Sequence, residues 1–175
     1  MTKPLLLAAT WLLTACTTPH GVAPAVSDRA AAAPADRFYQ SIATLCGQSF
    51  AGKIVANTPA SATPDSFAGK ALVMHVRECS DDELRVPFHV GDDRSRTWIL
   101  TRRAGGLRLK HDHRHADGSP DATTLYGGDT DTAGSQWRQE FPVDAESVAM
   151  FQRQGMHASL TNIWAMEIRP GSEFV

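Results

Sequence analysis

The sequence predicts a mainly β domain: an antiparallel up-and-down barrel of about eight strands with one N-terminal helix. From residue 49 onward, short segments rich in Val, Ile, Thr and aromatic residues recur about every ten residues, separated by Gly, Pro, Asp and Asn. Within several segments apolar and polar residues alternate, which places the apolar side chains on one face of a strand. The predicted strands are residues 49–56, 70–79, 84–90, 97–103, 107–115, 123–126, 136–143 and 159–169.

The helix is predicted directly before these strands. Asp36 is a suitable N-cap and Gly47 a suitable stop. Spacings of three and four residues place four apolar side chains on one face: Phe38, Tyr39, Ile42 and Leu45. A second segment, residues 144–154, fits either a helix capped by Asp144 or a strand over residues 147–151. We expect the first helix to close onto the sheet.

The first fifteen residues predict an export signal. Lys3 precedes an apolar run over residues 5–13, which is about half of the ~20 residues that a membrane-spanning helix needs. The sequence Leu13-Thr14-Ala15-Cys16 resembles the lipobox of bacterial lipoproteins, in which the Cys carries the lipid and becomes the new N-terminus. The alternative is a secreted protein cleaved nearby. Because Thr17 replaces the Asp that retains Gram-negative lipoproteins at the inner membrane, the resemblance implies the outer membrane.

Composition divides the remaining chain into a tether and one domain. Residues 16–36 begin with the lipidated Cys16 and are rich in Ala, Pro, Thr and Ser, with too few large apolar groups to fold. Residues 37–175 are enough for a single domain with one core. The net charge is −2 and the basic residues are scattered, which argues against a nucleic-acid partner. We therefore expect a membrane-attached protein with one folded unit.

Two of the three cysteines, Cys46 and Cys79, follow the predicted lipidation site. In a protein exported to an oxidising compartment, such a pair is expected to form a disulfide. The alternative is two buried free thiols.

The most informative segment is a predicted hairpin over residues 97–115. Gly105-Gly106 predicts a two-residue turn, which pairs Leu100 with His111 and Trp98 with His113. The polar, cationic face belongs in water, so the other face is predicted to point inward: Trp98, Leu100, Arg102, Leu107, Leu109, His111, His113 and His115. The imidazoles would then lie near the mouth of the barrel.

His111, His113 and His115 fit three interpretations: polar lining, a metal site or a catalytic site. Alternate residues of one strand lie about 7 Å apart, so neighbouring histidines can share an ion more easily than all three can. Zinc or copper would need a further ligand, for which four side chains are available: His75, His89, Asp117 and Asp121. Haem is another cofactor that such histidines could hold. The acidic Gly-containing loops 117–121 and 127–131 do not match the calcium-binding loop and are expected to be turns.

The layout of one helix followed by a meander of strands resembles the calycin superfamily, the lipocalins and their relatives. Three segments carry the resemblance: residues 46–52, 98–115 and 161–174. The Gly-x-Trp of lipocalins is here Gly47-x-x-Phe50, so the resemblance identifies no family ligand residues. It implies a small β-barrel with an internal ligand site.

The sequence carries no nucleophile or phosphate-loop motif, so we expect no enzymatic activity. The leading hypothesis is an envelope lipoprotein whose barrel binds a small apolar or amphipathic ligand through Trp98, Leu100, His111, His113 and Trp164. One alternative is a metal- or haem-binding protein that uses His111, His113 and His115. Another is a structural or partner-binding lipoprotein with a filled barrel and no ligand.

Overall fold

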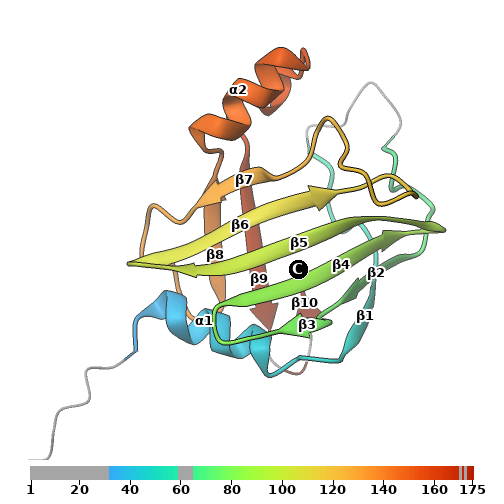
Figure 1. Ribbon diagram of the computed structural model, residues 1–175. Helices are drawn as coiled ribbons and strands as arrows, with labels where there is room; N and C mark the ends of the chain where they lie inside the picture. The colour runs from blue at the N-terminus through green and yellow to red at the C-terminus, as the bar shows by residue number, and fades with distance from the viewer. Residues whose placement is uncertain (1–31, 59–64, 170, 172) are drawn as a thin grey trace, which may run out of the picture. The chain divides into compact units, whose positions relative to one another are not determined.

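The computed structural model describes residues 32–58, 65–169, 171 and 173–175 (Figure 1). The predicted export signal, the lipidation site Cys16 and most of the tether lie outside these residues. The residues from Ala31 onward form one compact unit. Its elements are α1 (Pro34–Ala43), β1 (Ser49–Gly52), β2 (Leu72–His75), β3 (Glu78–Cys79), β4 (Glu83–Val90), β5 (Asp93–Arg103), β6 (Gly106–His113), β7 (Tyr126–Asp129), β8 (Arg138–Pro142), α2 (Ala145–Arg153), the short 3-10 helix η1 (His157–Ser159), β9 (Ile163–Arg169) and β10 (Glu173–Phe174).

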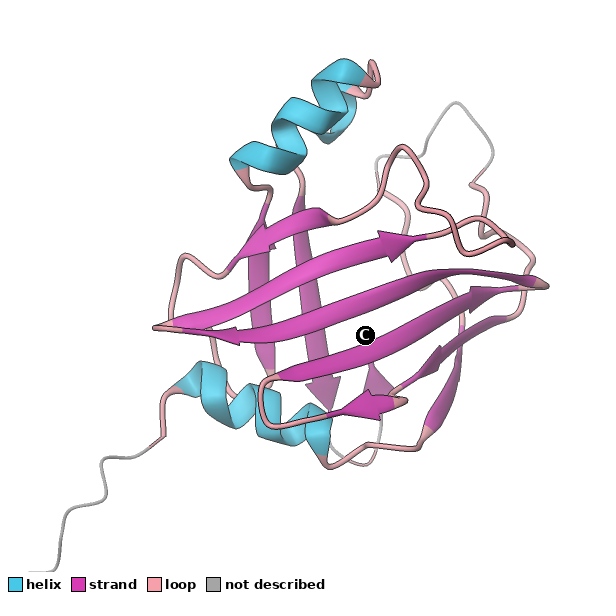
Figure 2. Ribbon diagram, viewed as in Figure 1, coloured by secondary structure: helices cyan, strands magenta, loops and turns pink. Residues whose placement is uncertain are grey.

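The strands form two antiparallel sheets. The larger has the order β1-β2-β4-β5-β6-β7, with β3 beside β4, and the smaller has the order β10-β9-β8. Figure 2 shows strands β4, β5 and β6 crossing in front of the smaller sheet. The prediction of a mainly β, antiparallel domain is therefore confirmed. Barrel closure stays a prediction, because the described strands belong to two separate sheets.

The two sheets approach each other along both edges. The backbone N–H of Asp144, after β8, donates to the carbonyl of Gly127 in β7 at 2.9 Å. Along the other edge, the rings of Phe50 in β1 and Phe174 in β10 lie 6.0 Å apart in an edge-to-face arrangement. These contacts enclose one core between the sheets.

The predicted strand 70–79 is divided by a bulge. Met74 in β2 pairs with Phe88, whereas Glu78 in β3 pairs with Arg85. The chain advances four residues from Met74 to Glu78 while β4 advances three from Phe88 to Arg85. The one extra residue forms a bulge that divides the strand in two. β10, at the end of the chain, was not among the predicted strands.

Strand β7 begins where the predicted strand 123–126 ends. The sequence Gly127-Gly128 looks like a turn, but both glycines lie inside β7 and are buried. A Cβ atom at Gly127 would overlap the carbonyl of Leu109, and one at Gly128 would overlap the carbonyl of Pro142. Glycine is needed here because β7 lies very close to both neighbouring strands.

Both predicted helical segments are helices, so the expectation of a single helix is wrong. α1 begins with Pro34, which fits the first turn, and Asp36 lies within that turn instead of capping it. In α2, the Asp144 carboxylate accepts a hydrogen bond from the Ser147 N–H at 2.9 Å, as the helical alternative predicted. Among the described residues, no helix has the length and apolar character needed to cross a bilayer.

The core is filled at the end that α1 covers. Phe38, Tyr39 and Ile42 of α1 are completely buried. They pack against side chains of both sheets: Val76, Leu84, Val86, Leu100, Leu107, Leu109, Phe141, Met166 and Ile168. Removing this much apolar surface from water is the main force that stabilises the domain.

A disulfide joins Cys46, in the turn after α1, to Cys79 in β3. The sulfur atoms are 2.02 Å apart and the Cα atoms 6.3 Å apart. The predicted pairing is confirmed, and the alternative of two buried free thiols is wrong. The bond ties α1 to the larger sheet.

Candidate functional site

The β5–β6 hairpin positions the candidate site, but its register differs from the prediction by two residues. The turn is Ala104-Gly105, so Trp98 pairs with His111 and Leu100 with Leu109. Gly106 is the first residue of β6, and a Cβ atom at this position would meet the Thr130 hydroxyl. The same hydroxyl accepts a hydrogen bond from the Leu107 N–H at 3.1 Å. A shift of two residues leaves every side chain on its predicted face.

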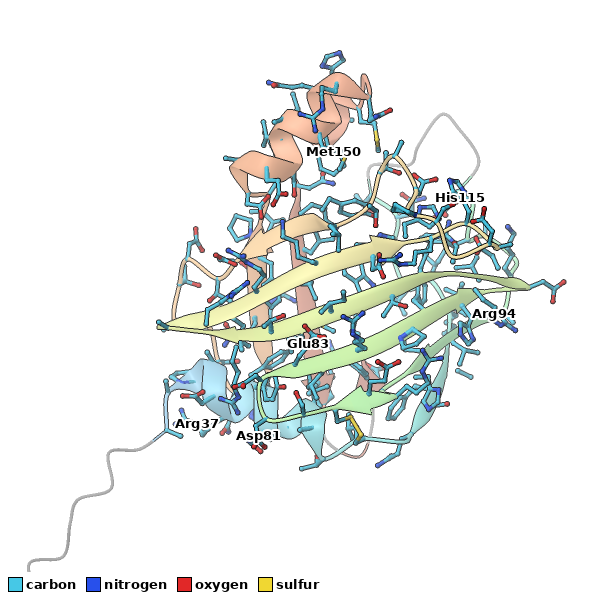
Figure 3. All side chains as sticks on the ribbon, viewed as in Figure 1. Arg37, Asp81, Glu83, Arg94, His115 and Met150 are labelled. Atoms are coloured by element: carbon cyan, nitrogen blue, oxygen red, sulfur yellow. A yellow bond between two sulfur atoms is a disulfide. The ribbon has the colours of Figure 1, made fainter. Side chains whose placement is uncertain are left out.

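The inner face of β6 changes from apolar to polar along the strand. Leu107 and Leu109 are almost completely buried, and His111 is only 3% exposed. His113 is half-buried and His115, beyond the end of the strand, is exposed. Figure 3 shows His115 and Met150 of α2 at one side of the domain and Arg37 and Asp81 at the other. The histidines therefore lie at the end of β6 away from α1.

The outer face of β6 carries cations held by carboxylates. Arg108 donates two hydrogen bonds to Asp129, at 2.5 and 2.7 Å. Lys110 Nζ lies 2.6 Å from the carboxylate of Asp144, the N-cap of α2. This face is the cationic one that the sequence predicted to lie in water, and the prediction holds only in part: the Lys110 side chain is 11% exposed, and Ile99 and Asp112 are buried.

Five rings gather on the inner face of the hairpin, at the end away from its turn. We call them the aromatic cluster: Trp98, His111, Tyr126, Phe151 and Trp164. The Tyr126 ring is at its centre and stacks on His111, with centroids 4.7 Å apart. It also lies 5.3 Å from Phe151 and 5.5 Å from Trp164. The Trp98 ring meets His111 edge to face at 4.7 Å. Trp98, Tyr126 and Trp164 are half-buried, so the cluster reaches solvent.

The structure thus brings together three predicted ligand-binding residues, Trp98, His111 and Trp164. Leu100 lies deeper, in the filled core, with no exposed surface. Sequence analysis missed Tyr126 and Phe151. Tyr126 ended a predicted strand, and Phe151 lay in the segment that fitted either a helix or a strand. A helix capped by Asp144 was the available signal for Phe151.

Leu125 positions the central tyrosine. Its φ angle is +56°, the only positive φ among the described residues other than glycine. Its N–H donates to the carbonyl of His111 at 2.6 Å, so the chain enters β7 directly beside that histidine. A left-handed conformation costs a leucine about 1–2 kcal/mol, which the surrounding contacts must offset.

The His111 imidazole is neutral near pH 7, and its Nδ1 lacks a hydrogen-bond partner in the part of the chain that the structure describes. Burial, together with the nearby charges of His113 and Arg96 and against the opposing effect of Asp112, lowers the imidazole pKa to about 4. Its Nδ1 is buried and has no hydrogen-bond partner among the described residues. A buried polar atom without a partner costs about 1–3 kcal/mol, so such atoms mark sites where water or a ligand supplies the partner. Burial also raises the pKa of Tyr126, which keeps the phenol protonated.

The three histidines of the predicted metal site do not converge. His111 points into the aromatic cluster, whereas His113 Nδ1 and His115 Nε2 each lie 3.8 Å from the Asp121 carboxylate. Asp117, another proposed ligand, is exposed and accepts hydrogen bonds from Ser119. In the ranges that the structure describes, no three His, Cys, Asp or Glu side chains group closely enough to hold a metal ion. The other two suggested ligands, His75 and His89, lie on β2 and β4.

Arg96 lies at the rim of the aromatic cluster. It pairs across the strands with His113 of β6 and Phe88 of β4, on the same face of β5 as Trp98. Its guanidinium forms an ion pair with Asp93. It also lies over the Phe67 ring, 5.6 Å from the centroid.

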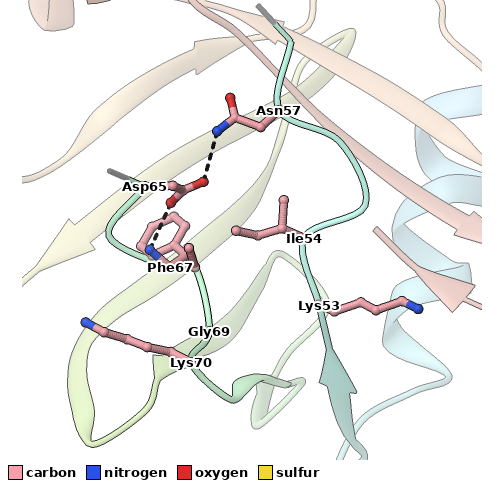
Figure 4. A pocket seen from close by; sticks show the side chains of 8 residues that line it. Lys53, Ile54, Asn57, Asp65, Phe67, Gly69 and Lys70 are labelled. Atoms are coloured by element: carbon pink, nitrogen blue, oxygen red, sulfur yellow. Dashed lines mark hydrogen bonds between the residues drawn. The ribbon is translucent and has the colours of Figure 1, made fainter. Parts of the chain in front are cut away.

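A cleft of about 430 Å³ opens beside this rim (Figure 4). Asp65 braces it by accepting hydrogen bonds from the Phe67 N–H at 2.8 Å and from Asn57 Nδ2 at 3.4 Å. The side chain of Ile54 points toward Phe67 in Figure 4. Phe67 also packs edge to face on Phe88, so it lies between the cleft and the rim.

Comparison with protein-family models, curated proteins and solved structures found no match. The resemblance to calycins therefore stays a prediction.

Proposed function

We propose that this chain is a lipid-anchored envelope protein that binds a small apolar or amphipathic ligand at the aromatic cluster, without catalysing a reaction. Lipid on Cys16 would hold it at the outer membrane, facing the periplasm. The observation that carries the ligand site is His111 Nδ1, a buried and unpartnered nitrogen between rings that reach solvent.

The half-buried rings supply the free energy of binding. A flat apolar group placed against Trp98, Tyr126 and Trp164 would remove their remaining surface from water, and each 100 Å² covered contributes roughly 2.5 kcal/mol. Aromatic stacking would add about 0.5–1.5 kcal/mol for each ring pair. In the tautomer that is protonated at Nε2, His111 Nδ1 would accept a hydrogen bond from a donor on the ligand, which would fix the orientation of the ligand.

The finer architecture belongs to the same proposal. The two sheets would act as a lipocalin-like barrel that is filled and closed by α1 at one end and open at the aromatic cluster. The contacts between β7 and the segment after β8, and between Phe50 and Phe174, support this arrangement. A site near the mouth of a small barrel is where such folds commonly hold ligands.

The test uses N-phenyl-1-naphthylamine, a neutral aromatic probe that carries one N–H donor and fluoresces in apolar surroundings. Residues 17–175 are suitable, because they contain the whole compact unit and its core. We expect saturable binding, a loss of at least tenfold in affinity for Trp98→Ala and about fivefold for His111→Phe. Trp137→Ala is the matched control because Trp137 is exposed and lies outside the cluster. Absence of saturable binding, or equal effects of Trp98→Ala and Trp137→Ala, would contradict the proposal.

A further inference from the structure

We infer that the ligand of the aromatic cluster is a compact amphipathic anion, whose charged group is bound by Arg96 at the rim. This inference rests on the proposed function, since it names the chemical class that the same site would take. It goes further because it assigns a charge to the ligand and a binding role to a residue that sequence analysis had not singled out.

Arg96 lies beside the aromatic cluster. Between residues 96 and 102, two cationic side chains share the inner face of β5: Arg102 near α1 and Arg96 near the cluster. Arg96 precedes Trp98 by two residues, so their Cα atoms are about 7 Å apart on one face. Its cross-strand partner His113 in turn lies 5.8 Å from His111, measured between ring centroids. A ligand stacked in the cluster therefore has the guanidinium within reach.

The two arginines differ in how their guanidinium groups are held. Arg102 uses Nε and one terminal nitrogen: Nε donates to the carbonyl of Asp81 at 2.8 Å, and the terminal nitrogen forms an ion pair with Asp36. The guanidinium also stacks over Tyr39, 4.1 Å from the ring centroid. Its surroundings already explain why a cation is present there.

Arg96 is less engaged. Its described hydrogen bonds to protein groups involve one terminal nitrogen, which donates to Asp93 and, at 3.5 Å, to the hydroxyl of Ser95. A guanidinium has five N–H donors, so Nε and the second terminal nitrogen keep donors for a carboxylate, sulfonate or phosphate. Its side chain is 20% exposed, which leaves it accessible from the rim.

The electrostatic surroundings of the cluster also favour an anion. The positive charge of Arg96 acts on both stacked rings of the cluster, because it lowers the pKa of His111 and opposes the raised pKa of Tyr126. Both rings are uncharged near neutral pH. An anionic ligand would therefore meet two neutral rings and Arg96, whose charge is partly balanced by Asp93 on one terminal nitrogen but whose remaining N–H donors favour an anion over a cation.

The test compares two probes that differ by one charged group. 8-Anilinonaphthalene-1-sulfonate has the ring system and N–H of N-phenyl-1-naphthylamine plus a sulfonate. For Arg96→Gln we expect the affinity for the sulfonate probe to fall tenfold or more, while the affinity for the neutral probe changes less than twofold. Arg96→Lys should recover part of the lost affinity, because it keeps the charge but loses the fork of donors. Arg103→Gln is the matched control: Arg103 is on the same strand, exposed and on the opposite face.

Each outcome separates the two proposals. If the wild-type protein binds the neutral probe but Arg96→Gln leaves sulfonate binding unchanged, or weakens both probes equally, the inference is overturned and the proposed apolar site stands. If the wild-type protein binds neither probe, the proposed function fails and the inference fails with it. Thermal unfolding of Arg96→Gln and Arg96→Lys identifies a variant that has lost its fold, and the lysine variant then carries the comparison.

Discussion

The ring of Tyr126 stacks on the imidazole of His111, with an angle of 26° between the two planes. This contact joins β7 to β6 and buries an imidazole where protonation is costly. The protein should consequently lose stability as the pH falls.

The first prediction concerns that pH dependence. In the unfolded chain His111 titrates near pH 6.5, whereas in the folded protein its pKa is lowered to about 4. Below pH 6.5 the unfolded state binds a proton that the folded state does not, so the stability present above pH 6.5 is lost progressively down to about pH 4, by roughly 3 kcal/mol in total. Urea unfolding of the wild type and His111→Phe from pH 4.5 to 7.5 measures this, and the variant should show the shallower dependence.

The exposed His115 provides the control for this experiment. His115→Gln should keep the pH dependence of the wild type. Parallel curves for the wild type and His111→Phe would show that the imidazole is not responsible.

The second prediction concerns the cap of α2. Asp144 caps the helix through Ser147 and binds Lys110; burial opposes its ionisation, but these hydrogen bonds prevail and lower its pKa. Asp144→Ala should cost about 1–2 kcal/mol of unfolding free energy and, by loosening α2, weaken the packing of Phe151 on Tyr126. Glu146→Ala, which removes an exposed carboxylate 3.4 Å from Lys110, should cost less than about 0.5 kcal/mol. Chemical unfolding measures both, and equal losses would refute the role of the cap.

The third prediction concerns the disulfide. Cys46 and Cys79 are 33 positions apart. A disulfide that closes a loop of this length lowers the conformational entropy of the unfolded chain, which raises the free energy of unfolding by about 3–4 kcal/mol. The double variant Cys46→Ser/Cys79→Ser should therefore unfold at a lower urea concentration, with a free energy of unfolding that is smaller by that amount. The wild type treated with a reductant should behave like the double variant. A reduced wild type as stable as the oxidised protein would contradict the prediction.

The fourth prediction concerns the anchor. Cys16→Ser should move the protein from the membrane fraction to the soluble periplasmic fraction, because the serine cannot carry the lipid thioether. Mass spectrometry of the wild-type N-terminal peptide should find a lipidated cysteine. Cys46→Ser, which leaves the lipobox unchanged, should remain with the membrane. A membrane-bound Cys16→Ser protein would exclude the lipid as its anchor.

The sequence was sufficient to predict which face of each strand is buried, but not the register in which the strands pair. Alternation along β4, β5 and β6 has a period of two, so it predicted the buried side of each strand whatever the register. The choice between Ala104-Gly105 and Gly105-Gly106 as the turn depends on Thr130, which contacts the start of β6 from much later in the chain. Local turn preferences contain no information about such a contact.

The candidate site was predictable in part for the same reason. Trp98, His111 and Trp164 follow from alternation within single strands. Tyr126 joins them because Gly127 and Gly128 let β7 lie close to its neighbours, and Phe151 because α2 follows β8. Both depend on how distant segments assemble, and a single sequence gives no direct signal of that assembly.

An ion pair joins Asp36, in the first turn of α1, to Arg102 of β5. It holds the start of α1 beside the hairpin end of β5, and His111 lies four residues beyond Leu107, the partner of Arg102. Four residues of strand span about 14 Å, so the start of α1 and the imidazole lie toward opposite ends of β6. A label attached to the first turn of α1 would therefore lie away from the aromatic cluster and leave its rings accessible.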